Sequence, residues 1–366
     1  MPVAEYWKAV TDGERRGVVA AAVRGGLRLL SGPAWLGLAA NLAVYRWGLR
    51  RPIRLDCPVV AVGNLTLGGT GKTTAVAYLV RRLALAGHVA GVVLRGYRRT
   101  PGRRPLLVSD GQGLLVPPAA AGDEASLLAS LLPGHPVAVG VRRERVGRLL
   151  LSRTAAEALV LDDGFQYFRL ARDADVVLVD ASHRIEDDRL FPAGTLREPH
   201  SHLRRATQLW VTHAELVSEG RLRELRGSLA RVAPELPIVV TEHCPGRLRA
   251  LAEAPSPPAG CRVLALSGLG NPRSFEFSLQ QLGYEVRPLV FPDHHCYGPH
   301  DWGRVRESMV ACGAEHVVTT EKDAVKLPPP PDDVVSVHVL SCELAVIEGL
   351  DAVDDLIEAV GSWHAR

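Results

Sequence analysis

The sequence lacks the cysteine patterns of a zinc ribbon or of a disulfide scaffold. Its six cysteines are scattered along 366 residues, and none of them forms a C-x-x-C pair. They are Cys57, Cys244, Cys261, Cys296, Cys312 and Cys342. This spacing supports neither a structural zinc site nor a disulfide-stapled fold, and it fits a reducing cytosol.

An apolar run long enough to cross a bilayer is also missing. The longest uncharged run near the N-terminus, Leu29–Tyr45, has 17 residues and is interrupted by Ser31, Gly32, Pro33 and Asn41. A spanning helix needs about 20 mostly apolar residues. The layout of a signal peptide is absent too, because the apolar part lies far from the first residue and no small-residue cleavage site is evident.

Acidic residues are scarce in the N-terminal segment. Residues 1–54 contain nine Lys/Arg and three Asp/Glu, a net charge of +6; the whole chain carries +3, so the remainder carries −3. The apolar, arginine-containing segment Gly17–Arg51 predicts a pair of helices in a membrane interface, with Trp35, Tyr45 and Trp47 at the lipid headgroups and arginines on anionic lipid. The alternative is that these helices simply pack on the rest of the protein. No recognition motif accompanies the basic excess, so nucleic-acid binding is not expected.

What the sequence does contain is a phosphate-loop unit. Val59–Val62 predicts a buried parallel strand, Gly63–Gly71 is a glycine-rich loop, and the residues from Lys72 onward have the apolar spacing of a helix. Lys72 would reach the β- and γ-phosphates of a nucleotide, and the Thr73 hydroxyl would hold Mg²⁺. The strict motif has Gly where this chain has Thr66. The alternative is a glycine-rich turn that opens an ordinary helix.

Charged residues follow several other predicted strands. Parallel strands present ligand sites at their carboxyl ends. Asp162 and Asp163 end the strand Ala158–Leu161, where an acidic pair could hold Mg²⁺ or could form a plain turn. Asp123 stands at the start of a predicted helix, where it could be only an N-cap. The other charged groups are the arginines of Arg95–Arg99, Arg143, and the pair Asp293-His294.

The length and the order of elements predict the architecture. A chain of this length is expected to form about two domains, and strands that alternate with helices imply parallel sheets in both halves. We expect an α/β fold: a phosphate-loop kinase-type parallel sheet with helices on both faces, and a second, smaller α/β domain across a cleft. The expected divisions are a membrane-associating helical segment at 1–54, a nucleotide-binding domain at 55–213, a second α/β domain at 214–342, and a C-terminal helix at 343–366 that could return to the first domain.

Seven motifs together resemble the tetraacyldisaccharide 4′-kinases of lipid A biosynthesis, spread in the family's order over roughly residues 15–326. This family also departs from the strict phosphate-loop motif at the position of Thr66. The motifs are Val62–Thr73 (VGNLTLGGTGKT), Arg95–Tyr97 (RGY), Gly122–Ala125 (GDEA), Asp162–Ala171 (DDGFQYFRLA), Pro192–Pro199 (PAGTLREP), Asp293–His294 (DH) and Thr320–Lys326 (TEKDAVK).

The resemblance implies an enzyme that transfers the γ-phosphoryl group of ATP, with Mg²⁺, to the 4′-hydroxyl of an acylated glucosamine disaccharide 1-phosphate. It implies two α/β domains around a cleft and peripheral attachment to the cytoplasmic face of the inner membrane. The implied partners are the acylated disaccharide lipid and an anionic membrane surface, with no obligate protein partner.

The resemblance also implies roles for individual residues. Asp123 matches the family's proposed catalytic base, and His294 matches the partner that orients this base. The implied nucleotide-binding residues are Thr66, Gly68, Gly69, Thr70, Gly71, Lys72, Thr73 and Thr74. The implied metal ligands are Thr73, Asp162, Asp163 and Glu198, and the groups near phosphate or substrate are Tyr97, Arg95, Arg143 and Arg197.

The sequence departs from the family at two places, and two alternatives stay open. Thr74 replaces a common proline, and Asp180–Arg189 is more acidic and less glycine-rich than usual. One alternative is a membrane-associated ATPase switch of the partitioning type, but the signature lysine of that group is Leu67 here. The other is a catalytically dead lipid-binding homologue, which the joint presence of the site residues argues against.

Overall fold

The computed structural model describes residues 3–11, 15, 17–96, 99, 104–251, 254–293, 295–331 and 336–363. Within these residues the strands form one 12-stranded sheet in the order β10-β9-β11-β12-β8-β7-β6-β1-β5-β2-β4-β3. The strands are β1 (Val59–Asn64), β2 (Ala90–Leu94), β3 (Leu106–Ser109), β4 (Val137–Val139), β5 (Ala158–Asp162), β6 (Ala174–Asp180), β7 (Gln208–Thr212), β8 (Ile238–Ala250), β9 (Arg262–Ser267), β10 (Glu285–Val290), β11 (His316–Thr320) and β12 (Val337–Glu348).

Helices surround this sheet. They are α1 (Val3–Thr11), α2 (Val18–Arg46), α3 (Lys72–Leu85), α4 (Pro118–Ala121), α5 (Asp123–Leu131), α6 (Arg143–Arg153), α7 (Glu219–Val232), α8 (Pro272–Gln281), α9 (Asp301–Cys312), α10 (Glu321–Ala324) and α11 (Leu350–Gly361). Three short 3₁₀ helices are η1 (Ile185–Asp187), η2 (His200–Arg205) and η3 (Ala214–Leu216). Neighbouring strands run parallel except in the pairs β3–β4 and β8–β12, so the predicted α/β class is confirmed.

The central strands are buried on both faces because helices cover both sides. On one face, α3, α5 and α11 pack on apolar side chains of β1, β2, β5, β6 and β7. On the other face, α6 packs on β1 and β5, while α7 packs on β6 and β7. This explains why β1, β5 and β6 are continuous apolar runs and not alternating ones. The carboxyl ends of these strands therefore meet at one edge, where the phosphate loop begins.

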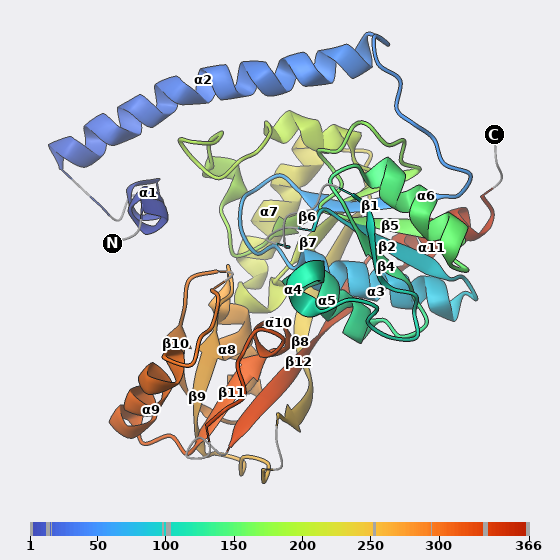
Figure 1. Cartoon of the computed structure of the whole chain (residues 1–366). Helices are drawn as coiled ribbons and strands as arrows, with labels where there is room; N and C mark the ends of the chain where they lie inside the picture. The colour runs from blue at the N-terminus through green and yellow to red at the C-terminus, as the bar shows by residue number, and fades with distance from the viewer. Residues whose placement is uncertain are drawn as a thin grey trace.

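Two long strands join this first lobe to a second one. Figure 1 shows β8 and β12 running from the upper lobe to the lower lobe, which contains β9–β11 with α8 and α9. β8 begins beside β7 in parallel register and continues antiparallel to β12. Helices α8 and α9 pack on opposite faces of the second lobe's strands. The sheet thus runs without interruption across the predicted boundary at residue 214, and the domain limits stay predictions.

The C-terminal segment differs from its prediction in one respect. Residues 343–348, predicted to be helical, are the end of β12, because they pair with β8 from Cys244 to Val240. The helix begins only at Leu350, after Gly349 adopts a left-handed φ of 80°. Its apolar residues then join the core around α3 in the first lobe.

The prediction of a helix pair within Gly17–Arg51 is wrong. Val18–Arg46 is a single helix of 29 residues that continues through Pro33, and Figure 1 shows it lying across the top of the first lobe. The Ser31 hydroxyl donates to the carbonyl oxygen of Leu190 at 2.9 Å. Trp35 packs against His202 and Tyr45 against Phe168, so these two aromatics face the protein and not a membrane, whereas Trp47 is exposed. By length and composition α2 is long and apolar enough to cross a membrane, which corrects the expectation that the interrupted apolar run is too short to do so.

Candidate active site

The phosphate loop lies between β1 and α3, as predicted. Gly68 and Gly71 have φ values of 121° and 77°, which a side chain would disfavour. The Lys72 Nζ lies 3.3 Å from the Oδ1 of Asn64, at the end of β1. The Thr70 carbonyl oxygen accepts a hydrogen bond from the Thr212 hydroxyl at 3.1 Å. These contacts fix both ends of the loop, so its backbone amides are held where a helix N-terminus favours anions.

The acidic pair stands beside this loop because β5 is next to β1. Val62 is in register with Asp162, and the following turn comes so near that a Cβ on Gly63 would lie 2.5 Å from the Cβ of Phe165. Asp163 has a left-handed φ of 52°, which is uncommon for a residue other than glycine and typical of functional turns. Because Gly63 has no side chain, the acidic turn can approach the start of the phosphate loop.

Asp163 binds two cations. Its carboxylate accepts hydrogen bonds from Nη1 of Arg197 at 2.8 and 2.9 Å, and its Oδ1 lies 3.8 Å from Nζ of Lys72. Burial by itself would raise the pKa of Asp163, but Lys72 and Arg197 outweigh it, so the pKa lies below its ordinary value. The ionised carboxylate therefore holds Lys72 and Arg197 together at the mouth of the phosphate loop.

Asp162 is different, because it has no such partner. Its Oδ1 is buried without a hydrogen-bond partner. Burial, and then the negative charge of Glu124, raise the pKa of Asp162 to about 7, although Lys72 opposes the shift. A buried carboxylate oxygen that lacks a donor is suited to a cation, and hard oxygen ligands suit Mg²⁺. Asp162 thus fits the predicted metal, and the predicted ligand Thr73 is the second residue of α3.

Two predicted arginines lie on the other side of the acidic pair. Arg143 is buried at the start of α6 with its guanidinium 4.5 Å from the centre of the Tyr167 ring. Burial lowers the pKa of Arg143, and Arg95 lowers it further, while Tyr167 and the acidic pair oppose this. The Nε of Arg143 is buried without a partner. Arg95 and Arg143 therefore add positive charge close to the acidic pair, as a phosphate site requires.

The proposed base begins helix α5. Asp123 is its first residue, after Gly122 with a φ of 90°. The second residue of α5 is Glu124, whose negative charge raises the pKa of Asp162, and α5 contacts α3, the helix that follows the phosphate loop. Helix α5 also contacts α10 of the second lobe. The predicted residues Tyr97 and His294 lie outside the described part of the chain, but the neighbouring Asp293 is bound by Lys322 at 3.0 Å.

Glu198 has contacts that differ from those of a free metal ligand. It is fully buried, and its Oε2 lies 2.6 Å from both Nδ1 of His202 and Nη2 of Arg205. These partners fix the 3₁₀ helix η2 to the preceding turn. Its other oxygen, Oε1, is buried without a hydrogen-bond partner, as is Oδ1 of Asp162. Glu198 as a metal ligand therefore stays a prediction.

The second lobe touches the phosphate loop directly. A Cβ placed on Gly270 would lie only 2.7 Å from the Gly69 nitrogen. Asn271 reaches across with its amide, 3.4 Å from Oδ2 of Asp180 and 3.3 Å from the Ser182 hydroxyl. The sequence did not single out Asn271, because only the fold brings this residue of the second lobe to the phosphate loop.

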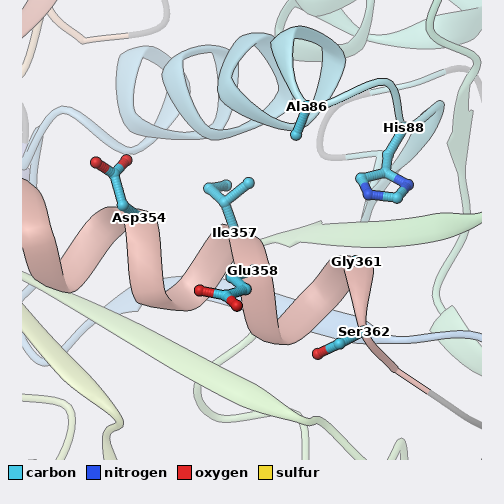
Figure 2. Close-up of a pocket in the computed structure, with 7 residues that line it drawn as sticks. All are labelled: Ala86, His88, Asp354, Ile357, Glu358, Gly361 and Ser362. Carbon is cyan, nitrogen blue, oxygen red and sulfur yellow. The ribbon is translucent and has the colours of Figure 1, made fainter.

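The cavity in Figure 2 is separate from this site. It has a volume of about 470 Å³ and lies between the end of α3 and α11. Its lining residues are Ala86, His88, Asp354, Ile357, Glu358, Gly361 and Ser362. Helix α3 has 14 residues, so its two ends are about 20 Å apart. The predicted site residues lie at the opposite end of this helix.

A phosphate loop with an adjoining acidic pair and arginines, on a parallel sheet, defines a nucleotide-dependent phosphotransferase of the phosphate-loop class. Comparison with known proteins gives the family. The sequence model of the tetraacyldisaccharide-1-P 4′-kinase family matches residues 24–360, and the chain belongs to this family. Both the resemblance and the predicted activity, ATP-dependent phosphorylation in lipid A biosynthesis, are confirmed.

Individual relatives agree with this assignment. A protein of Anaeromyxobacter dehalogenans (strain 2CP-C), named tetraacyldisaccharide 4′-kinase, is 44% identical over 323 residues, which cover 86% of this chain and 84% of the relative. A protein of Halothermothrix orenii with the same name is 36% identical and covers 87% of each chain. The crystal structure of the "apo" form of LpxK from Aquifex aeolicus in complex with ATP is similar, with a TM-score of 0.70 and 28% identity, over 92% of this chain and 99% of that chain.

Proposed function

We propose that the chain binds ATP on the phosphate loop and phosphorylates the 4′-hydroxyl of a tetraacyl glucosamine disaccharide 1-phosphate, to give the 4′-phosphorylated lipid A precursor, lipid IVA. The observation that carries this proposal is the convergence of Lys72 and Arg197 on Asp163, beside the unpaired Oδ1 of Asp162. This arrangement supplies the charges that a transferred phosphoryl group needs.

The phosphate loop and the charged side chains beside it would each have a role in binding ATP. The loop amides and Lys72 would bind the β- and γ-phosphates, and Arg197 and Arg143 would neutralise the transferred group. Thr73 and Asp162 would hold Mg²⁺. When bound, this ion supplies further positive charge to the phosphate oxygens. Asp163 would keep Lys72 and Arg197 oriented by its salt bridges.

The chemical step is the transfer itself. The Asp123 carboxylate would accept the proton of the 4′-hydroxyl while the hydroxyl oxygen bonds to the γ-phosphorus. The bond from that phosphorus to the β–γ bridging oxygen breaks, and ADP leaves. His294 would orient Asp123 from the second lobe, so the contact between the lobes at Gly69 and Gly270 would assemble the site.

Helix α2 supports binding at a membrane, where an acylated acceptor resides. Leu29, Leu30 and Leu36 are 80%, 59% and 67% exposed, whereas Ser31 and Trp35 on the other side contact the first lobe. A one-sided apolar helix with arginines favours the interface of an anionic bilayer. We therefore assign the chain a peripheral position on the cytoplasmic face of the inner membrane.

The test is direct phosphorylation of the lipid. The full chain is incubated with Mg²⁺, γ-labelled ATP and detergent-solubilised tetraacyl disaccharide 1-phosphate, and label is sought in the lipid. The wild-type chain is expected to label the lipid and Lys72→Ala to give none. Arg153→Ala, which removes an exposed cation at the end of α6, is the control and should retain full activity.

Two results would contradict the proposal. Free phosphate without labelled lipid would favour the ATPase switch of the partitioning type. Normal lipid labelling by a folded Lys72→Ala chain would show that the phosphate loop does not serve the reaction.

A further inference from the structure

A buried cluster of His213, Glu215 and His243 lies directly behind the phosphate loop, and none of its members was predicted from the sequence. His213 follows β7, Glu215 lies in η3, and His243 lies in β8. The two imidazole rings stack with centres 4.2 Å apart and an interplanar angle of 19°. All three side chains are at most 5% exposed. A buried set of ionisable groups of this kind requires an explanation.

His243 is bonded to the start of helix α3. Its Nε2 lies 2.9 Å from the Thr74 hydroxyl oxygen, and this hydroxyl donates to the Gly71 carbonyl oxygen at 2.8 Å. Since a hydroxyl has one proton, Nε2 of His243 must be the donor to Thr74. The ring is so close that a Cβ on Gly71 would lie 2.8 Å from Nε2. His243 therefore fixes the last turn of the phosphate loop.

His213 packs on His243 and reaches toward the end of β6. Its ring stacks on the His243 ring, its Nε2 lies 3.9 Å from Oδ2 of Asp180, and its own backbone is left-handed, with a φ of 57°. This conformation is uncommon for a residue with a side chain and is kept only where the surroundings impose it. The turn after β7 thus directs the His213 imidazole onto the His243 ring, which contacts the loop.

Glu215 joins the two rings to the second lobe. Its Oε1 accepts a hydrogen bond from the Ser274 hydroxyl of α8 at 2.8 Å and lies 3.4 Å from Nδ1 of His213. Its Oε2 accepts from the backbone N–H of His243 at 3.0 Å. Burial, and then the proximity of His213, lower the pKa of His243 to about 3, so its ring is neutral and the single ring proton is the one on Nε2.

The three residue types would suit a divalent metal, and potential ligand atoms of the three side chains lie within 4.8 Å of one another, as a metal site requires. However, several of their polar atoms are already used in hydrogen bonds within the protein, because both Glu215 oxygens accept hydrogen bonds and Nε2 of His243 is engaged with Thr74. We propose instead that His213, Glu215 and His243 are positioning residues, which hold the phosphate loop in its ATP-binding form. This inference rests on the proposed function of the loop.

A double-mutant cycle tests the bond between His243 and Thr74. His243→Leu removes the donor, and Thr74→Val removes the hydroxyl while keeping the branched shape. Binding of a fluorescent ATP analogue is measured with Mg²⁺ and without lipid. Each variant is expected to weaken binding by about three- to tenfold, as the loss of one hydrogen bond predicts. The affinity of the double variant should be no lower than that of the single variant with the lower affinity, because both changes break the same contact. Thr74→Ser keeps the hydroxyl and should bind the analogue like the wild type.

Controls separate positioning from stability. His338→Gln alters another buried histidine, on β12 in the second lobe, and should leave binding unchanged. Thermal melting shows whether each variant is folded at the temperature of the binding assay. Loss of folded protein would lower the number of binding sites, whereas loss of positioning would lower the affinity of each site. In the ¹⁵N spectrum of histidine-labelled protein, His243 should show the tautomer with its proton on Nε2.

Four results would overturn the inference. Unchanged affinity in folded single variants would refute it, and so would independent, additive losses in the double variant. One equivalent of bound zinc in the purified protein, lost in His243→Leu, would replace it with a metal site. A wild-type chain that binds no nucleotide would refute the proposed function as well, which the wild-type measurement distinguishes from failure of this inference alone.

Discussion

The contact between the second lobe and the phosphate loop can be tested with one methyl group. Gly270 does not have a left-handed backbone, so alanine is conformationally allowed there. Its Cβ, however, would lie 2.7 Å from the Gly69 nitrogen and 3.1 Å from the Gly69 Cα. An ordinary contact is 3.4–4 Å. Gly270→Ala must therefore move two backbone segments apart by several tenths of an ångström or more.

The expected cost follows from the rigidity of these segments. Overpacking of a closely packed site costs about 1–3 kcal/mol, which corresponds to a factor of about 5–150 in the population of the closed arrangement. If closure of the lobes assembles the catalytic site, kcat/KM for lipid phosphorylation should fall by a factor in this range. The melting temperature should change little, because Gly270 lies in a partly exposed turn and not in a core.

Gly303→Ala is the matched control. It introduces the same methyl group in the same lobe, within α9, where a Cβ would meet nothing within 4 Å. Alanine is a better helix former than glycine by about 1 kcal/mol, so this variant should melt slightly higher and retain its activity. If folded Gly270→Ala had the kcat/KM of Gly303→Ala, the contact at Gly69 would not matter for catalysis, and the reasoning would fail.

Three further predictions concern single groups. Asp123→Asn should lower kcat by about 10²–10⁴-fold with little change in KM for ATP; a rise in KM alone would make Asp123 a binding residue. Glu198→Gln should lower the melting temperature, since it weakens the bonds to His202 and Arg205. The Mg²⁺ concentration for half-maximal activity should not change; an increase in that concentration would identify Glu198 as a metal ligand. Leu29→Asp should reduce cosedimentation with anionic vesicles without affecting ATP binding, and undiminished cosedimentation would place the membrane contact elsewhere.

Local chemistry made part of this molecule predictable. The phosphate loop could be identified because a strand, a glycine-rich loop and Lys72 follow one another in the chain. The acidic pair could be placed because Asp162 ends an apolar strand, and parallel strands share one carboxyl edge. The alternation of strands and helices likewise predicted the α/β class.

The errors arose where distant segments decide the structure. Residues 343–348 form a strand because β8, about a hundred residues earlier in the chain, provides the partner. Trp35 faces the protein because His202 lies beneath α2. The positioning cluster was missed because single histidines at positions 213 and 243 carry no sequence signal, and only the pairing of β7 with β8 brings His213 and His243 together.

One segment connects the proposed membrane surface to the phosphate loop. At one end, the Trp7 indole donates to the Pro192 carbonyl oxygen at 2.7 Å, and Ser31 of α2 binds Leu190. At the other end, the Leu67 amide of the phosphate loop donates to the Thr195 carbonyl oxygen at 2.8 Å. Two residues further on, Arg197 binds Asp163. If the acceptor lies in a bilayer, as the proposed function implies, this short segment, bonded at both ends, would hold ATP at a fixed height above the membrane surface. The helices that would bind the membrane are thereby tied to the arginine that would bind the phosphoryl group.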